Sequence, residues 1–162
     1  MKGKKTQGSR MRFKSKKTNL LKSFKAGRTK HQPVIYYIED SDLSRKLTSA
    51  MIETWNYDVV AEESPVAVLI DIVIDKIDCI VMDFSLRGFE PIHYIPLIEK
   101  AGVPIVFYSG HDGYYIKKYF RDNNYKLGTD IGFITKPYIH ELKNYINSLL
   151  FDNNRDSAIL EA

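Results

Sequence analysis

The sequence VIYYIED at residues 34–40 places two acidic residues directly after five apolar ones. An uninterrupted apolar run of this length, rich in Val, Ile and Tyr, is typical of a strand buried on both faces of a parallel sheet. The same arrangement, an apolar run that ends at a polar residue, recurs in CIVMD at 79–83, IVFYS at 105–109 and FITKP at 133–137. The sequence therefore predicts four buried parallel strands.

The polar residues that close these runs are Glu39-Asp40, Asp83, Ser109 and Lys136. In an open α/β sheet, groups just beyond the carboxyl ends of the strands converge on one crevice. We therefore expect three carboxylates, a hydroxyl and a lysine to meet at one point. Such a set can bind a divalent cation and handle a phosphoryl group. The same carboxylates are also compatible with a plain cation site on a structural domain.

Helical patterns and turn signals separate the strands. A helix is expected after Asp40, because apolar residues recur there at helical spacing. These residues are Leu43, Leu47, Ala50, Met51 and Trp55. A short strand at 59–61 precedes a helix that Ser64-Pro65 opens, and later helices are expected at 92–100, 113–121 and around 142–150. Five strand–helix units in a row imply an α/β fold with three layers and a parallel sheet.

The charge is divided unevenly along the chain of 162 residues. Residues 1–30 contain 12 of the 24 Lys and Arg residues and no acid, whereas the remainder contains the other 12 together with all 20 Asp and Glu residues. A basic segment of +12 therefore precedes an acidic part of −8. We expect a basic N-terminal arm at 1–32, one compact domain at 33–150 and a C-terminal tail at 151–162.

Several classes of protein are excluded by composition and pattern. The single cysteine, Cys79, rules out an internal disulfide, and its place in a predicted strand favours a buried side chain over a reactive thiol. No run approaches the roughly 18 apolar residues of a membrane span, and no signal-peptide pattern opens the sequence. We therefore expect a cytoplasmic protein. The P-loop motif G-x-x-x-x-G-K-[ST] does not occur.

The basic arm supports more than one interpretation. Its lysines surround a few apolar residues, and the segment 18–26 could form a short amphipathic helix. A solvated arm is the plainest interpretation. Weak, sequence-independent nucleic-acid binding by residues 1–30 comes next, then contact with an anionic membrane surface. The arm could also fold back onto the acidic domain.

From Val34 to Leu150, the chain resembles the receiver domain of bacterial two-component response regulators. The matching pieces are Glu39-Asp40, Asp83, Ser109-Gly110 and the segment 132–137 that ends in Lys-Pro. Each piece alone is common, but all four in this order, each at a strand end, are quite specific. The resemblance implies a flavodoxin-like (CheY-like) five-stranded parallel sheet of order 2-1-3-4-5, with helices on both faces.

The expected chemistry centres on Asp83 as the phosphoacceptor, a carboxylate that attacks a phosphoryl group to form an acyl phosphate. Lys136 would pair with one phosphoryl oxygen, and Ser109 would donate a hydrogen bond to another. Catalysis of this kind is mostly positioning and electrostatics. We expect no enzymatic activity beyond the domain's own phosphorylation and dephosphorylation.

Mg²⁺ is the expected cofactor, because attack by an anion on a charged phosphoryl group needs charge neutralisation. Asp40 and Asp83 are the natural direct ligands, and Glu39 acts through a water molecule. In the family pattern, the backbone carbonyl of Ser85 fills a further position.

The resemblance also implies a switch. Ser109 and Phe133 occupy the positions at which a hydroxyl is drawn inward on phosphorylation and an aromatic ring rotates into the space left. Phe133 equally fits a plain core aromatic. The Lys136-Pro137 bond is a candidate cis peptide at Pro137.

The chain departs from the family in two segments. The stretch 84–91 lacks the usual Met-Pro and following glycine, and the distance from Asp83 to Ser109 is slightly short. The distance from Ser109 to Lys136 is several residues long, with the extra length around 123–130. We therefore expect an atypical signalling surface.

The expected function is that of a stand-alone receiver in a phosphorelay. The implied partners are a histidine kinase or phosphotransfer protein and a downstream protein, with the chain a monomer or a phosphorylation-dependent dimer. The alternative is a pseudo-receiver: the same fold as an interaction module that is not phosphorylated, with the arm binding nucleic acid or another polyanion.

Overall fold

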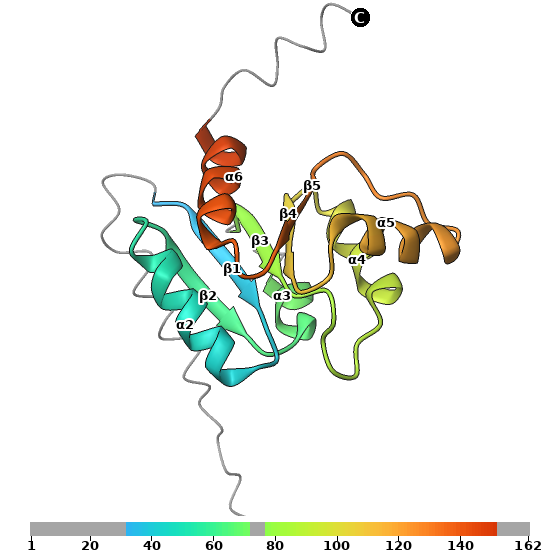
Figure 1. Cartoon of the computed structure of the whole chain (residues 1–162), viewed down its shortest axis with the longest axis horizontal. Helices are drawn as coiled ribbons and strands as arrows, with labels where there is room; N and C mark the ends of the chain where they lie inside the picture. The colour runs from blue at the N-terminus through green and yellow to red at the C-terminus, as the bar shows by residue number, and fades with distance from the viewer. Residues whose placement is uncertain (1–31, 72–76, 152–162) are drawn as a thin grey trace, which may run out of the picture. The chain divides into compact units, whose positions relative to one another are not determined.

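The structure is a computed structural model that describes residues 32–71 and 77–151. Five parallel strands form one sheet in the order β2-β1-β3-β4-β5 (Figure 1), which confirms the predicted fold class. In chain order, the strands are β1 (Val34–Ile38), β2 (Asp58–Glu62), β3 (Cys79–Met82), β4 (Ile105–Ser109) and β5 (Ile131–Thr135). The arm as far as residue 31 and the tail from residue 152 lie outside the described residues.

Helices connect the strands: α2 (Asp42–Glu53), α3 (Pro65–Asp71), α4 (Pro91–Lys100), α5 (Gly113–Asp122) and α6 (Ile139–Phe151). Side-chain caps begin two of them, because Ser41 Oγ accepts from the Ser44 N–H at α2 and Asp112 Oδ1 accepts from the Tyr115 N–H at α5. α4 starts at Pro91, where the missing N–H costs nothing. None of the described helices is long and apolar enough to cross a membrane.

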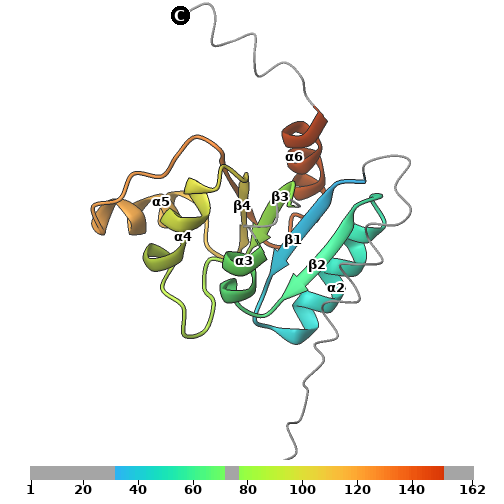
Figure 2. The same ribbon diagram turned by 180° about the vertical axis from the view of Figure 1, so that it is seen from behind.

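Two apolar cores lie on opposite faces of the sheet, which explains why β1 is apolar throughout. Ile35 and Tyr37 pack into the cluster that contains residues of α2 and α6. Tyr36 and Ile38 pack into the cluster formed with α3, α4 and α5. Figures 1 and 2 show the helices on both sides of the sheet. A strand buried on both faces has no position for a polar residue until it ends.

α2 directs its apolar stripe outward. The side chains of Leu43 and Leu47 are 69% and 59% exposed, whereas Ile52 is fully buried. On the inner side, Arg45 uses its guanidinium to donate a 2.6 Å hydrogen bond to the backbone carbonyl of Glu39. The sequence pattern predicts this helix correctly. The carbonyl of Glu39, at the end of β1, is hydrogen-bonded by Arg45, so this polar side chain lies on the inner side of α2 and the stripe with Leu43 and Leu47 faces solvent.

Candidate functional site

The sheet brings four of the expected residues to one edge. Ile38 at the end of β1 pairs with Met82 at the end of β3, and Ser109 at the end of β4 pairs with Thr135 at the end of β5. The next residues along β1, β3 and β5 are therefore Glu39, Asp83 and Lys136, beside Ser109 at the last position of β4. Because all the strands are parallel, these side chains share the carboxyl edge.

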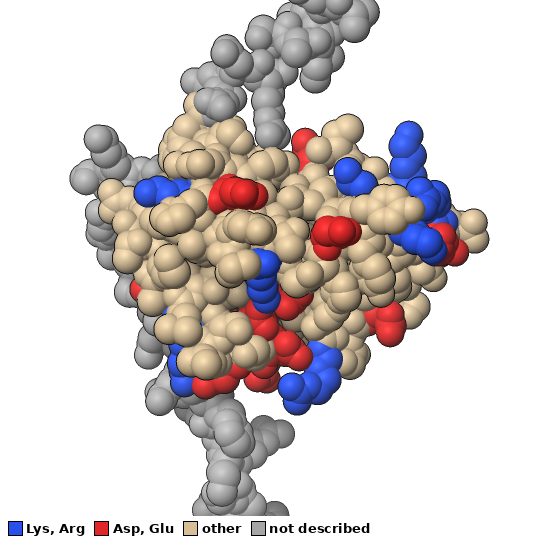
Figure 3. Space-filling view, viewed as in Figure 1, with Lys and Arg blue, Asp and Glu red and all other residues tan. Residues whose placement is uncertain are grey.

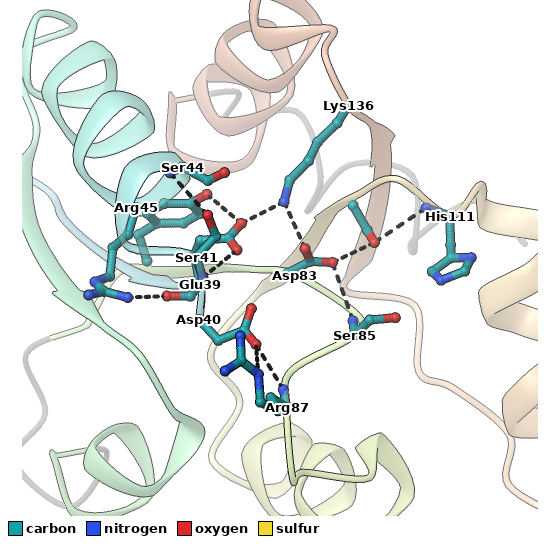
Figure 4. A network of polar contacts seen from close by, with 12 residues as sticks. Glu39, Asp40, Ser41, Ser44, Arg45, Asp83, Ser85, Arg87, His111 and Lys136 are labelled. Atoms are coloured by element: carbon teal, nitrogen blue, oxygen red, sulfur yellow. Dashed lines mark hydrogen bonds and ion pairs between the residues drawn. The ribbon is translucent and has the colours of Figure 1, made fainter.

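Lys136 joins two of the carboxylates directly. Its Nζ atom lies 2.6 Å from Glu39 Oε2 and 2.8 Å from Asp83 Oδ2 (Figure 4). The other Asp83 oxygen, Oδ1, accepts a 2.6 Å hydrogen bond from Ser109 Oγ. We call Glu39, Asp83, Ser109 and Lys136 the inner cluster. The ion pair with Lys136 and the hydrogen bond from Ser109 hold Asp83 in one orientation at the end of the central strand.

The charges of the inner cluster stabilise each other. Burial raises the pKa of the Asp83 carboxyl, but the hydrogen bonds from Lys136 and Ser109 outweigh burial and leave that pKa below its usual value. Burial lowers the pKa of Lys136, whereas its hydrogen bonds to Asp83 and Glu39 raise it, with a net increase. Asp83 is therefore an anion and Lys136 a cation at neutral pH.

Glu39 is the most enclosed charged member of the inner cluster. The Ser41 N–H donates a 3.0 Å hydrogen bond to Glu39 Oε1, and the Tyr37 hydroxyl donates one of 3.3 Å to Oε2. Burial is the main reason that the pKa of Tyr37 is raised, so its hydroxyl keeps the proton that it donates. A carboxylate with these partners and Lys136 is satisfied without any metal ion.

Asp40 follows Glu39 but faces a different partner. Its Oδ2 atom accepts a 3.1 Å hydrogen bond from the backbone N–H of Arg87 and lies 3.7 Å from Arg87 Nε. We call Asp40 and Arg87 the outer pair, because the Arg87 side chain is 88% exposed whereas that of Lys136 is 26% exposed. Figure 3 shows acidic side chains gathered where β1 ends, with basic side chains at the border of that patch.

Sequence reasoning missed Arg87 as a partner of the acidic residues. The signal was a basic residue four positions after Asp83, in a loop that the resemblance had already marked as unusual. A turn fixes its place: the Phe89 N–H donates to the Leu86 carbonyl oxygen at 3.1 Å, and Gly88 has a φ of 79°. This positive φ at the third position is what a type II turn requires.

Two further residues border the inner cluster. The Ser85 N–H donates a 3.3 Å hydrogen bond to Asp83 Oδ1, which places Ser85 beside the phosphoacceptor candidate. The His111 N–H donates a 3.3 Å hydrogen bond to Ser109 Oγ, and its ring stacks on Tyr115 at a centroid distance of 4.3 Å. The segment after β3 and the segment after β4 are therefore both hydrogen-bonded to the inner cluster through backbone N–H groups (Figure 4).

The candidate switch residue Phe133 lies in β5 and is partly buried. Its ring stacks on Phe107 at 5.9 Å between centroids, and Lys117 Nζ lies 4.7 Å from the ring centre. A Cβ atom at Gly113 would come within 3.0 Å of Phe133 Cβ, so α5 packs closely against this residue. The Lys136–Pro137 peptide bond that follows β5 is cis.

The oxygen groups at this edge can supply some, but not all, of the six ligands of a Mg²⁺ ion. Among the described residues, no three Asp, Glu, His or Cys side chains gather closely enough to hold a metal ion by themselves. Lys136 contacts both Glu39 and Asp83, but the Glu39 side chain is 3% exposed and that of Asp83 is 16% exposed. The more accessible oxygens are therefore the carboxylates of Asp40 and Asp83 and the carbonyl of Ser85. Mg²⁺ commonly takes one or two carboxylates and completes its octahedron with water. The donor set therefore fits a partly hydrated Mg²⁺ ion.

Comparison with known proteins identifies the fold. No protein-family model and no curated protein sequence matches the chain. The receiver domain of the hybrid histidine kinase CckA aligns with 22% identity and a TM-score of 0.54, over 72% of this chain and 98% of that domain. A receiver protein from Sinorhizobium medicae aligns with 18% identity and a TM-score of 0.61, over 74% and 95%.

The chemotaxis response regulator CheY4 of Vibrio cholerae is similar at the same level, with 14% identity and a TM-score of 0.59 over 74% of this chain and all of that one. The chain therefore has the fold of response-regulator receiver domains, as the sequence motifs predict.

Proposed function

We propose that this protein is a receiver in a phosphorelay and that Asp83 accepts the phosphoryl group. The observation that carries the proposal is the inner cluster, in which Lys136 and Ser109 each hold a different oxygen of Asp83. An ionised carboxylate at the open edge of a parallel sheet, fixed by a cation and a hydroxyl, is arranged for nucleophilic attack.

In the proposed reaction, a carboxylate oxygen of Asp83 forms a bond to the phosphorus of the donor. The bond between phosphorus and the donor's leaving group breaks, and the leaving group departs with the electron pair. Lys136 and Ser109 then exchange their contacts with Asp83 for contacts with phosphoryl oxygens. These donors are already in place, so little reorganisation is needed as charge moves onto the phosphoryl group.

We propose Mg²⁺ as the cofactor, with Asp40, Asp83 and the Ser85 carbonyl as its protein ligands and Glu39 acting through water. When bound, the ion would neutralise the charge of the phosphoryl oxygens, which otherwise repel the Asp83 carboxylate. The enclosure of Glu39 supports an indirect role for it, because its side chain is 3% exposed whereas that of Asp83 is 16% exposed.

The proposed output is a change of packing around β5. Ser109 accepts from the His111 N–H and donates to Asp83, so a shift of its hydroxyl toward a phosphoryl group alters the start of the segment that leads to α5. Phe133, packed between Phe107 and α5, is the side chain that would respond. Such a two-state repacking would be read by protein–protein contact.

We propose that the protein acts in the cytoplasm, with a histidine kinase or phosphotransfer protein as donor and a downstream protein as target. In this proposal, the protein is not an enzyme acting on other substrates, because the group that is phosphorylated is its own Asp83. The pseudo-receiver alternative would use the same fold without phosphorylation.

Intact mass measurement after incubation with acetyl phosphate and Mg²⁺ tests the proposal. We expect a gain of one phosphoryl group that disappears when the metal is chelated, because the Asp83 carboxylate and the donor repel each other. A protein that gains no phosphoryl group under conditions that label a known receiver would contradict the proposal and support the pseudo-receiver.

A further inference from the structure

Arg87 is a cation at the acidic edge that the reaction described above leaves without a role. It lies at the second position of the turn 86–89, and its backbone N–H donates to Asp40 Oδ2. The turn therefore fixes the backbone of Arg87 beside the acidic residues, while its side chain stays almost fully exposed. A tethered but exposed guanidinium can change partners at little cost.

The contacts divide the carboxylates between two cations. Lys136 is paired with Glu39 and Asp83, and Arg87 is the cation that faces Asp40 among the ion pairs of the described residues. The guanidinium of the nearby Arg45 is instead directed to the Glu39 carbonyl and to Asp42. Metal binding at Asp40 would therefore release Arg87 in particular, because a guanidinium and a divalent cation compete for the same oxygen.

The released side chain has a defined place to act. A cavity of about 360 Å³ opens beside the outer pair, and its lining includes Asp40, Ser85, Arg87, Tyr115 and Tyr119. It is bounded by the loop after Asp83 and by α5; the acidic Glu90 also lines it, and Ser85 in its wall donates through its N–H to Asp83. Guanidinium groups bind phosphate through two parallel hydrogen bonds, which a lysine cannot reproduce.

We propose that Arg87 is a binding residue for the phosphoryl group of the donor: its guanidinium is the counter-ion of Asp40 before metal binding and contacts the donor's phosphoryl oxygens afterwards. This inference rests on the proposed phosphorylation of Asp83. The transfer itself is unchanged: Asp83 forms the new bond to phosphorus, and the leaving group departs with the electron pair of the bond that breaks. Arg87 contributes charge and orientation before that step.

Arg87→Ala tests the first half of the inference without any phosphorylation. The substitution removes the guanidinium but keeps the backbone N–H that supports Asp40, so the turn is preserved. We expect Mg²⁺ to bind about two- to fivefold more tightly by isothermal titration calorimetry, because a competing cation is gone. The matched control is Lys100→Ala, which removes one positive charge from the other end of α4. Equal affinities in the two variants, or weaker binding in Arg87→Ala, would overturn the counter-ion role.

The second half is tested by the rate of adduct formation at saturating Mg²⁺, with acetyl phosphate and phosphoramidate as donors. Arg87→Ala should raise the half-saturating concentration of both donors about three- to tenfold, with a smaller change in the maximal rate. Arg87→Lys should recover part of this loss and Lys100→Ala should show none. An effect on acetyl phosphate alone would show that Arg87 binds the leaving group instead of the phosphoryl group, and this would overturn the inference. No effect on either donor would overturn it as well.

The two proposals fail in different ways. If the unmodified protein gains no phosphoryl group from either donor, the proposed function is wrong. If it is labelled normally and Arg87→Ala behaves like Lys100→Ala, only the inference about Arg87 is wrong. A steeper loss of rate with added salt in the unmodified protein than in Arg87→Ala would support electrostatic attraction of the donor by Arg87.

Discussion

The inner cluster and the outer pair lie at the same edge of one sheet and use the same chemistry, yet they differ in burial. Lys136 makes two ion pairs and is largely enclosed, whereas Arg87 makes one longer contact and is almost fully exposed. A buried charge that loses its partner is costly, while an exposed one is solvated by water. The inner cluster is therefore suited to hold a fixed geometry, and the outer pair is suited to change partners.

The largest expected difference concerns the phosphoryl adduct itself. Asp83→Asn should abolish the adduct completely, because the amide is not a nucleophile and Asp83 is the carboxylate that Lys136 and Ser109 both hold. Arg87→Ala should still be labelled at high donor concentration. Intact mass and a phosphopeptide map measure both. Persistence of the adduct in Asp83→Asn would place the chemistry on another residue, and the inner cluster would then not be the site of phosphorylation.

The next effect is on folding stability. Lys136→Ala leaves two enclosed carboxylates without their cation, and we expect a loss of about 3 kcal/mol in the free energy of unfolding. Arg87→Ala should cost less than about 0.5 kcal/mol, because the Arg87 side chain is exposed and Asp40 keeps the hydrogen bond from the backbone N–H of residue 87. Urea unfolding followed by circular dichroism gives both values. Equal losses would show that burial does not distinguish the two cations.

Mg²⁺ affinity should distinguish Asp40, a proposed direct ligand, from Lys136, which lies beside the metal site. Asp40→Ala should weaken binding at least about tenfold, because a direct ligand and its charge are lost. Lys136→Ala should keep or slightly raise the affinity, since a cation near the metal is removed. It should nevertheless fail to adopt the activated conformation with beryllofluoride. If Lys136→Ala lost Mg²⁺ as severely as Asp40→Ala, the lysine would be a structural support of the metal site.

The smallest expected effect is in the acid dependence of stability. The pKa of Asp83 is lower in the folded protein than in the unfolded chain, where it is about 3.9. Its contribution is therefore present above about pH 4 and is lost as the pH falls through the folded pKa. The pKa of Lys136 is raised, so its contribution persists until the pH exceeds about 10.4.

The free energy of unfolding should thus decline more steeply in the unmodified protein than in Asp83→Asn as the pH is lowered from about 6 to about 2.5, because only the unmodified protein has the Asp83 carboxylate to protonate. Arg87→Ala should follow the unmodified protein, since the Lys136–Asp83 pair is intact in it. Parallel curves for the unmodified protein and Asp83→Asn would mean that the ion pair contributes nothing to the folded state.

α2 illustrates where sequence patterns stop. Leu43 and Leu47 have helical spacing, and a helix forms there, but the stripe lies on the solvent side while Ile52 and Arg45 face the sheet. Periodicity records which residues share a face of a helix. It does not record which face the rest of the protein covers, and here the polar end of β1 needs a donor on the inner side.

The sequence alone determined the strands and the edge at which the polar residues meet. Apolar runs rich in β-branched and aromatic residues that end in Glu39, Asp83, Ser109 or Lys136 are typical of buried strands with polar ends, and a parallel sheet brings those ends together. The strand order came from resemblance to a family, because an alternating pattern fits several orders.

Only the tertiary structure decided which acid faces which cation. Lys136 could have met any of the three carboxylates, and its position at the end of β5 directs it to Glu39 and Asp83. Arg87 reaches Asp40 across 47 positions of sequence, because a turn with a positive φ at Gly88 points its backbone there. Local patterns encode burial, but distances between loops depend on turns and packing that no single segment contains.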